Sequence, residues 1–172
     1  MDKRTSRYQK KVSQRQEKQA AKDVGGRIQA GSGNVKLGGG ADVRKQGEIR
    51  IECKYTSGTS YNIKLSELRK VKTQALRGGL EEPVLQFAFR DKSTGRLDCY
   101  AVRPHIPHGD DDHTILAETK AKSYTVSQTE LMSTFLHYEE AALGFHVNGR
   151  VEWYDVMKWD RFLLYLERRD NA

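Results

Sequence analysis

The stretch EIRIECKY, residues 48–55, alternates charged residues with apolar or aromatic ones. Successive side chains of a β-strand point to opposite faces, so this alternation predicts a strand with one face toward a core. Glu48, Arg50, Glu52 and Lys54 then share the other face. Two interpretations stand: these are the charges of a solvated surface strand, or the strand presents carboxylates to a metal ion.

The residues before this strand predict a hairpin. Residues 42–44 indicate a short strand and residues 45–47 a tight turn, after which the chain returns. Asp42 lies ten residues before Glu52, and a hairpin of this length brings the two carboxylates together. Such a pair suits Mg²⁺, a hard cation that takes oxygen ligands and keeps several waters, with Mn²⁺ as a substitute.

Two neighbours of Glu52 extend this hypothesis. The Cys53 side chain points into the core, but its backbone carbonyl is a candidate metal ligand. Lys54 shares the face of Glu52, where it would help to deprotonate an attacking water or stabilise charge on a phosphate.

Positive charge is concentrated near the N-terminus. The chain has a net charge of +7, and residues 1–27 hold nine Lys or Arg against three Asp or Glu. A basic arm of this kind favours a polyanion through counterion release, and nucleic acid is the expected partner. The alternative is a soluble, frayed terminus. The basic residues that we expect to contact DNA are Arg4, Arg7, Lys10, Lys11 and Arg27.

Helix and strand patterns along the 172 residues predict a single α/β domain with a mixed sheet. We expect residues 1–15 to be a flexible arm. Ser66 and Ser127 are expected to cap helices, the second with Glu130 in a capping box and reaching about residue 142, with Leu131, Met132, Phe135 and Leu136 inward. Asn148-Gly149 predicts a hairpin. Further strands are expected at 83–90, 97–103, 145–147 and 150–156, and further helices at 8–24 and 158–168.

Several classes of protein are disfavoured. No apolar run approaches the ~18 residues of a membrane span, and the N-terminus is unlike a secretory signal, so we expect a cytoplasmic protein. Cys53 and Cys99 form no metal-binding pattern and are expected to be reduced. The glycine-rich residues 25–42 contain no GK[ST], so no phosphate-cradling loop and no nucleotide cofactor is expected.

Residues 104–151 are harder to assign. Asp112, Glu118 and Lys120 precede SYTVSQTEL much as Asp42, Glu52 and Lys54 precede SYNIKLSEL. A decayed duplication with a second site is one interpretation, and a repeated use of a strand followed by a capped helix is the other. His105, His108 and His113, with Asp110–Asp112, form either a zinc site or, as we favour, a polar loop.

Several stretches in order resemble a known family: QEKQAAKDVGGRIQAGSGN, GGGADVR, IECKYTSGTSYNIKLSEL and QALRGGLEEPVLQFAF, with YAVRP and WDRFLLYLE near the end. They are similar to Holliday junction resolvases of archaeal and phage type, within the PD-(D/E)XK superfamily. The resemblance implies a restriction-endonuclease-like fold, with residues 104–151 as an inserted helix and hairpin.

The resemblance also implies roles. Glu17 would help to hold Mg²⁺ with Asp42 and Glu52, and Lys54 would complete the catalytic set. Ser32, Ser60 and Gln74 would lie near DNA.

The predicted function is a Mg²⁺-dependent endonuclease that resolves four-way DNA junctions as a homodimer, in the cytoplasm of a cell or of a phage host. One alternative is a nuclease of the same fold that acts on other branched, mismatched or duplex DNA. The other is a DNA-binding protein without catalysis.

Overall fold

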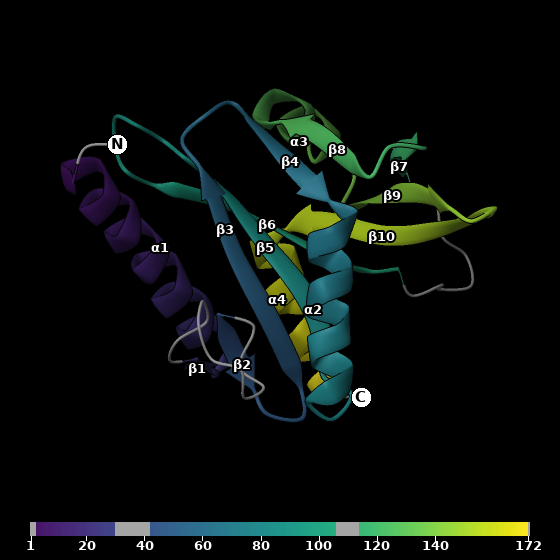
Figure 1. Cartoon of the computed structure of the whole chain (residues 1–172), viewed down its shortest axis with the longest axis horizontal. Coiled ribbons are helices and arrows are strands. Elements are labelled where there is room, and N and C mark those ends of the chain that lie inside the picture. Colours follow the sequence, from purple (N-terminus) through teal and green to yellow (C-terminus); the bar gives the residue numbers. More distant parts are fainter. Residues whose placement is uncertain (1–2, 30–41, 106–113, 172) are drawn as a thin grey trace.

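An eight-stranded mixed sheet forms the centre of the computed structural model, which describes residues 3–29, 42–105 and 114–171 (Figure 1). The strand order is β1-β2-β3-β5-β6-β10-β9-β7, and β4 and β8 form a separate two-stranded ribbon. The elements are α1 (Lys3–Val24), β1 (Arg27–Ile28), β2 (Val43–Lys45), β3 (Ile49–Thr56), β4 (Ser60–Lys64), α2 (Leu65–Arg77), β5 (Glu82–Arg90), β6 (Leu97–Pro104), β7 (Thr114–Thr119), β8 (Ser123–Ser127), α3 (Gln128–Thr134), β9 (Glu140–Val147), β10 (Arg150–Lys158) and α4 (Trp159–Asp170).

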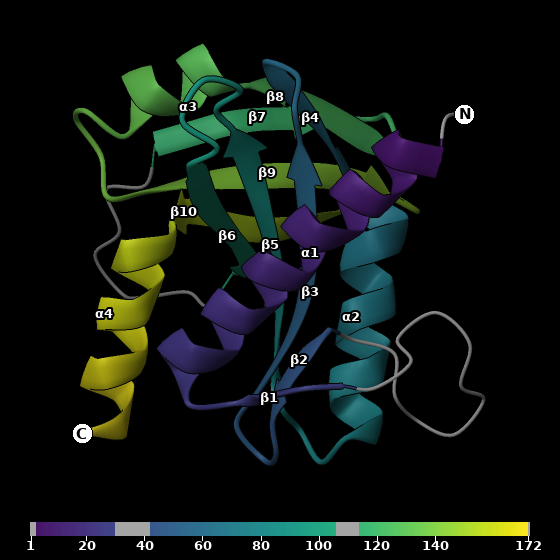
Figure 2. The ribbon, with the colours of Figure 1, turned by 90° about the vertical axis from the view of Figure 1, so that its left-hand side faces the viewer.

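Each face of the sheet is covered by its own layer. Helices α1 and α4 cover one face, where Ala20 and Phe162 pack with Ile51 of β3. Figure 2 shows α1 running across the sheet in front of β3 and β5. Helices α2 and α3 and the β4–β8 ribbon cover the other face, where Ile63 and Val126 join a core rich in aromatic side chains. The fold is therefore α/β, with a mixed sheet flanked by helices on both faces.

The sheet repeats one unit in two orientations. The order strand, ribbon strand, helix, strand, strand occurs in β3–β4–α2–β5–β6 and again in β7–β8–α3–β9–β10. In each unit the first and fourth elements pair in parallel (β3 with β5, β7 with β9), and a helix lies in the connection between them. The two units meet through antiparallel β6–β10 and β4–β8 pairs. The two units are therefore related by an approximate two-fold symmetry within one chain, which we call the internal pseudo-two-fold.

The ribbon register supports this symmetry. SYNIK and SYTVS are offset by 63 residues, and β4 pairs with β8 so that Asn62 faces Thr125, its own counterpart at that offset. At this offset the counterparts of Ser60 and Lys64 are Ser123 and Ser127, so the symmetry converts the Ser60–Ser127 pair into the Lys64–Ser123 pair. Residues 104–151, which we expected to be an insertion, thus contribute most of the second unit.

Most expected elements are present, with differences at their boundaries. The basic arm is helical from Lys3 onward. Helix α2 begins at Leu65 without a side-chain cap, so the cap predicted at Ser66 is wrong. The Ser127–Glu130 capping box is confirmed.

The helix predicted to reach residue 142 ends at Thr134. Residues 140–147 pair with both β7 and β10 and form a buried strand. Met132, within α3, and Leu136, beyond its end, are exposed rather than inward, whereas Leu131 and Phe135 are buried as predicted. The Asn148-Gly149 hairpin is confirmed, with a positive φ at both residues.

Both cysteines are free thiols, as expected. Across the described ranges, the structure has no helix with the length and apolar character needed to cross a membrane.

Candidate active site

Two of the four charged residues on one face of β3 are buried, which bears on the solvated-strand interpretation of EIRIECKY. Arg50 and Glu52 are 3% and 6% exposed, while Ile49 and Ile51 pack on the opposite face of the sheet. A solvated surface strand would leave such charges in water, so that interpretation is wrong for Arg50 and Glu52. Buried charges need partners or a ligand, because desolvation is costly.

Arg50 finds its partner in Glu81, which lies just before β5. The Glu81 carboxylate accepts hydrogen bonds from Arg50 Nε (2.8 Å), Arg44 Nε (2.5 Å) and the Gly47 backbone N–H (3.2 Å). Arg44 also donates to the Gly78 carbonyl at the end of α2. We call Arg44, Arg50 and Glu81 the arginine clamp, since they tie the β2–β3 hairpin to α2 and β5.

Asp42 lies directly across the hairpin from Glu52. The β2–β3 register pairs Val43 with Ile51, and its continuation by one residue sets Asp42 opposite Glu52. The Asp42 backbone N–H donates to the Ile51 carbonyl (3.0 Å), and Asp42 Oδ2 accepts from the Cys53 N–H (2.8 Å). The two residues therefore lie opposite each other across the hairpin, as the sequence predicts.

The Glu52 carboxylate is held by two ammonium groups. Its Oε1 accepts from Lys54 Nζ at 2.8 Å and from Lys70 Nζ of α2 at 3.3 Å. Its Oε2 is buried and has no hydrogen-bond partner among the described residues. A buried carboxylate oxygen without a donor costs free energy, so Glu52 retains one oxygen for a further ligand.

Glu17 belongs to the same electrostatic group, although it comes from α1. Burial raises the pKa of Glu17, a hydrogen bond from Ser13 Oγ (3.0 Å) partly offsets this, and the negative charges of Asp42 and Glu52 raise it further. A bound cation would relieve this repulsion.

Lys54 keeps its proton. Burial alone would lower its pKa, but the hydrogen bond to Glu52 and the charges of Glu52, Asp42 and Glu67 outweigh burial, and the pKa of Lys54 is raised. An ammonium group at neutral pH stabilises negative charge and does not abstract a proton. This favours the charge-stabilising role over the base role for Lys54.

These donors suit a hard cation. Carboxylate oxygens are the ligands that Mg²⁺ prefers, and it fills its remaining positions with waters and phosphate oxygens. The unpaired Glu52 Oε2 and the mutual repulsion of the carboxylates fit such an ion. Within the described ranges, no three His, Cys, Asp or Glu side chains form a group that could hold a metal ion as they are placed, so Glu17, Asp42 and Glu52 would have to draw together around an ion, with water or substrate as further ligands.

The other residues that were predicted to contact DNA lie at separate places in the fold. Ser60 is exposed at the start of β4, Gln74 lies one turn after Lys70 on α2 with a buried, unpaired Oε1, and Arg27 is exposed in β1. Lys10 and Lys11 are exposed on α1. Arg4 and Arg7 belong to α1, but their side chains lie outside the described set, as does Ser32.

The second E-x-K does not reproduce the site. Glu118 pairs with Gly144 and contacts His146, whereas Thr119 pairs with Phe145 of the aromatic core. Glu118 therefore lies on the sheet face opposite to the one that carries Glu52. In β7 the residues on the face that corresponds to that of Glu52 and Lys54 are Ala117 and Thr119, which pair with Leu143 and Phe145 of the aromatic core.

The expected histidine group is only partly described. His105 Nδ1 lies 2.5 Å from Asp155 Oδ1, and Asp155 also pairs with buried Arg103. His108, His113 and Asp110–Asp112 lie outside the described residues.

Sequence reasoning missed Lys70 and the clamp residue Glu81. Lys70 sits among exposed lysines of α2, and only the packing of α2 beside β3 brings it to Glu52. Glu81 follows Gly78-Gly79, and its pairing with Arg50 depends on the parallel β3–β5 register. A buried strand with an arginine was the available signal, because a buried Arg requires an acid.

The chain matches none of the protein-family models, curated proteins or solved structures with which it was compared. The geometry of the site is therefore the main support for a function.

Proposed function

We propose that the protein is a Mg²⁺-dependent endonuclease that cuts branched DNA, with four-way junctions as its main substrate. The observation that carries this proposal is the buried Glu52 carboxylate, which has ammonium groups on one oxygen, no partner on the other, and Asp42 across the hairpin. The resemblance to PD-(D/E)XK resolvases supports it, and with it we propose that the sheet belongs to the restriction-endonuclease-like class.

In this proposal Asp42, Glu52 and Glu17 hold the ion, together with the Cys53 carbonyl. The bound Mg²⁺ supplies Lewis-acid activation of a water and neutralises charge on the phosphate. Lys54 remains protonated and stabilises the negative charge that develops on the phosphate oxygens. Lys70 donates to Glu52 Oε1 and orients the carboxylate, so it is a positioning residue.

DNA would approach along the basic side of α1 and the loop after β3. Lys10 and Lys11 are exposed on α1, and Ser60 is exposed beside the end of the catalytic strand. Contacts of this kind go to phosphates and carry little sequence information, so binding is expected to depend on DNA shape and steeply on salt.

A paired cut would need two chains. Among the described residues, the first unit carries the acidic set, whereas the second has Ala117 and Thr119 on the corresponding face of β7. Two symmetric nicks at one junction therefore require two active sites from a homodimer. The internal pseudo-two-fold does not supply a second active site, so it does not replace the homodimer.

The test is cleavage of a synthetic four-way junction in Mg²⁺, compared with a flap, a mismatched duplex and a linear duplex. Asp42→Asn and Glu52→Gln should abolish cutting without abolishing binding, and Lys54→Ala should lower the rate by about 10²–10³ as the loss of one charge-stabilising group. Glu48→Gln is the matched control, since Glu48 is a carboxylate of the same hairpin that pairs with Lys45 near the surface.

Each outcome has a consequence. Cutting that survives in both Asp42→Asn and Glu52→Gln would reject the site. Equal cutting of all four DNAs would favour a nuclease of broader substrate range over a junction resolvase. Junction binding with no cutting in any metal would favour a DNA-binding protein without catalysis.

A further inference from the structure

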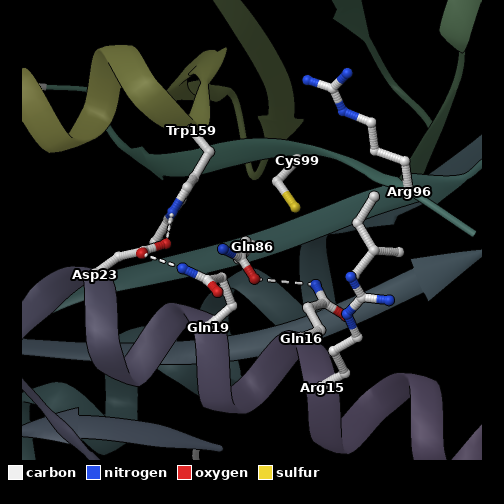
Figure 3. Close-up of a pocket in the computed structure, with 9 residues that line it drawn as sticks. Arg15, Gln16, Gln19, Asp23, Gln86, Arg96, Cys99 and Trp159 are labelled. Carbon is white, nitrogen blue, oxygen red and sulfur yellow. Dashed lines mark hydrogen bonds between the residues drawn. The ribbon is translucent and has the colours of Figure 1, made fainter.

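A hollow of about 360 Å³ lies apart from the acidic site, between α1 and the β5–β6 part of the sheet (Figure 3). Helix α1 supplies Arg15, Gln16 and Gln19 from one side. Gln86 and Cys99 of the sheet and Trp159 at the start of α4 also line it, with Asp23, Arg96 and Leu97. A volume of this size is within the range of small-molecule sites.

One residue that lines the hollow carries a buried acceptor that nothing in the described chain satisfies. Gln16 is 1% exposed, and its Nε2 donates to the Lys54 carbonyl (2.9 Å) and to Gln86 Oε1 (3.0 Å). Since both partners are acceptors, they fix the amide with its nitrogen toward them. Gln16 Oε1 is then buried without a donor, which costs free energy. An N–H group of a bound molecule would remove that cost.

Positive charge lies at one end of the hollow. Figure 3 places Arg15 and Arg96 at the end away from Trp159 and Asp23. Both residues are exposed, and neither guanidinium has an ion-pair partner within the described part of the chain. A guanidinium group binds phosphate through two parallel hydrogen bonds, so a pair of them selects a phosphorylated ligand.

We propose that this hollow binds a nucleotide, with its base edge against the glutamine amides and its phosphate at Arg15 and Arg96. Glutamine amides are well suited to read base edges, and every base offers an N–H donor for Gln16 Oε1. The site is built from side chains, so it does not need the P-loop that the sequence lacks. The nucleotide is either free or an unpaired nucleotide of branched DNA, and the second source rests on the proposed function.

Tryptophan fluorescence gives a direct assay. The chain has two tryptophans, and Trp159 lines the hollow, so a Trp153→Phe protein reports from Trp159 alone. This protein is titrated with each deoxynucleoside monophosphate and with inorganic phosphate. It is also titrated, in an Asp42→Asn background, with DNA that carries one unpaired base or an abasic site at the same position.

We expect saturable quenching by nucleotides or by the unpaired base, and at least tenfold weaker binding after Arg15→Ala or Arg96→Ala. Lys92→Ala is the matched control, because Lys92 is exposed in the same β5–β6 turn region as Arg96 and does not line the hollow. Quenching by monophosphates identifies a free nucleotide as the ligand. Quenching only by DNA with the unpaired base identifies the DNA source.

Three results would overturn the proposal: no saturable change with any ligand, quenching by inorganic phosphate equal to that by nucleotides, or an equal loss in Lys92→Ala. The free-nucleotide titration needs no DNA binding, so it separates this proposal from the nuclease. Junction cleavage that persists in the Arg15→Ala, Arg96→Ala double variant would leave the nuclease assignment intact.

Discussion

Replacing Glu81 by glutamine tests the arginine clamp, because it removes the one charge that Arg44 and Arg50 share. The Glu81 side chain is fully buried and that of Arg50 is 3% exposed. Removing one member of a buried ion pair costs about 3–5 kcal/mol, since the remaining charge stays desolvated. Glutamine keeps the shape and can still accept a hydrogen bond, so we expect a loss near the lower end, about 3 kcal/mol.

Denaturant unfolding followed by circular dichroism measures this loss. Against a typical domain stability of about 5–15 kcal/mol, the variant should still fold at 25 °C but unfold at a much lower denaturant midpoint with an unchanged m-value. The control is Glu48→Gln, where the pair with Lys45 is partly exposed and should contribute less than about 1 kcal/mol.

The pH dependence gives a second signature. Burial alone would raise the pKa of Glu81, but hydrogen bonds from Arg44, Arg50 and the Gly47 N–H lower it below the usual 4.5. A lowered folded-state pKa contributes stability that is present above pH 4.5 and is lost as the pH falls through the folded value. In Glu81→Gln, the loss of folding stability as the pH is lowered (the acid limb of the stability curve) should be smaller. A loss under about 1 kcal/mol, with an unchanged acid limb, would refute the clamp.

Three further predictions follow from the same structure. A Cβ at Gly144 would lie 2.8 Å from the Trp153 ring, so Gly144→Ala should destabilise the fold by roughly 1–3 kcal/mol in thermal or denaturant unfolding, and unchanged stability would contradict the packing of β9 against β10. Burial, with a smaller contribution from the Asp42 charge, raises the pKa of Glu17, so as the pH is lowered the Mn²⁺ affinity should begin to fall at a higher pH than it would with an ordinary carboxylate. Calorimetry at several pH values should show this fall shifted to lower pH in Glu17→Gln, and an unshifted fall would exclude Glu17 as a ligand. Replacing Lys10 and Lys11 together by alanine should weaken junction binding and reduce the salt slope by up to about two, and an unchanged slope would place the DNA elsewhere.

The hairpin around EIRIECKY was predictable because its signals are local. Strand alternation, a turn ending at Gly47 with φ +78°, and the ten-residue separation between Asp42 and Glu52 depend only on neighbouring residues. The same holds for the Ser127 capping box and the Asn148-Gly149 turn.

The errors arose where tertiary pairing overrides local pattern. Residues 140–147 are a short apolar run, which periodicity cannot assign to helix or strand, and pairing with β7 and β10 makes them a strand. Tertiary pairing also answers the question that the sequence left open for the second E-x-K, because a β-bulge between Ile115 and Ala117 and the β7–β9 register put Glu118 on the other face.

Parts of the site were beyond sequence reasoning for a related reason. Lys70, Glu81 and Gln16 acquire their roles from packing between elements that are distant in the chain: Lys70 is 18 residues from Glu52, Glu81 is 31 residues from Arg50, and Gln16 is 38 residues from Lys54. Their residue types are ordinary for exposed helix or loop positions, so only the fold shows what they contact.

The most direct test of the central claim is a Mn²⁺ anomalous-difference map from crystals of the protein. The account predicts a peak between Asp42 and Glu52, with Glu52 Oε2 and an Asp42 oxygen at roughly 2.0–2.3 Å, and loss of that peak in Glu52→Gln. A saturating soak with no peak there, or with a peak elsewhere that persists in Glu52→Gln, would contradict it.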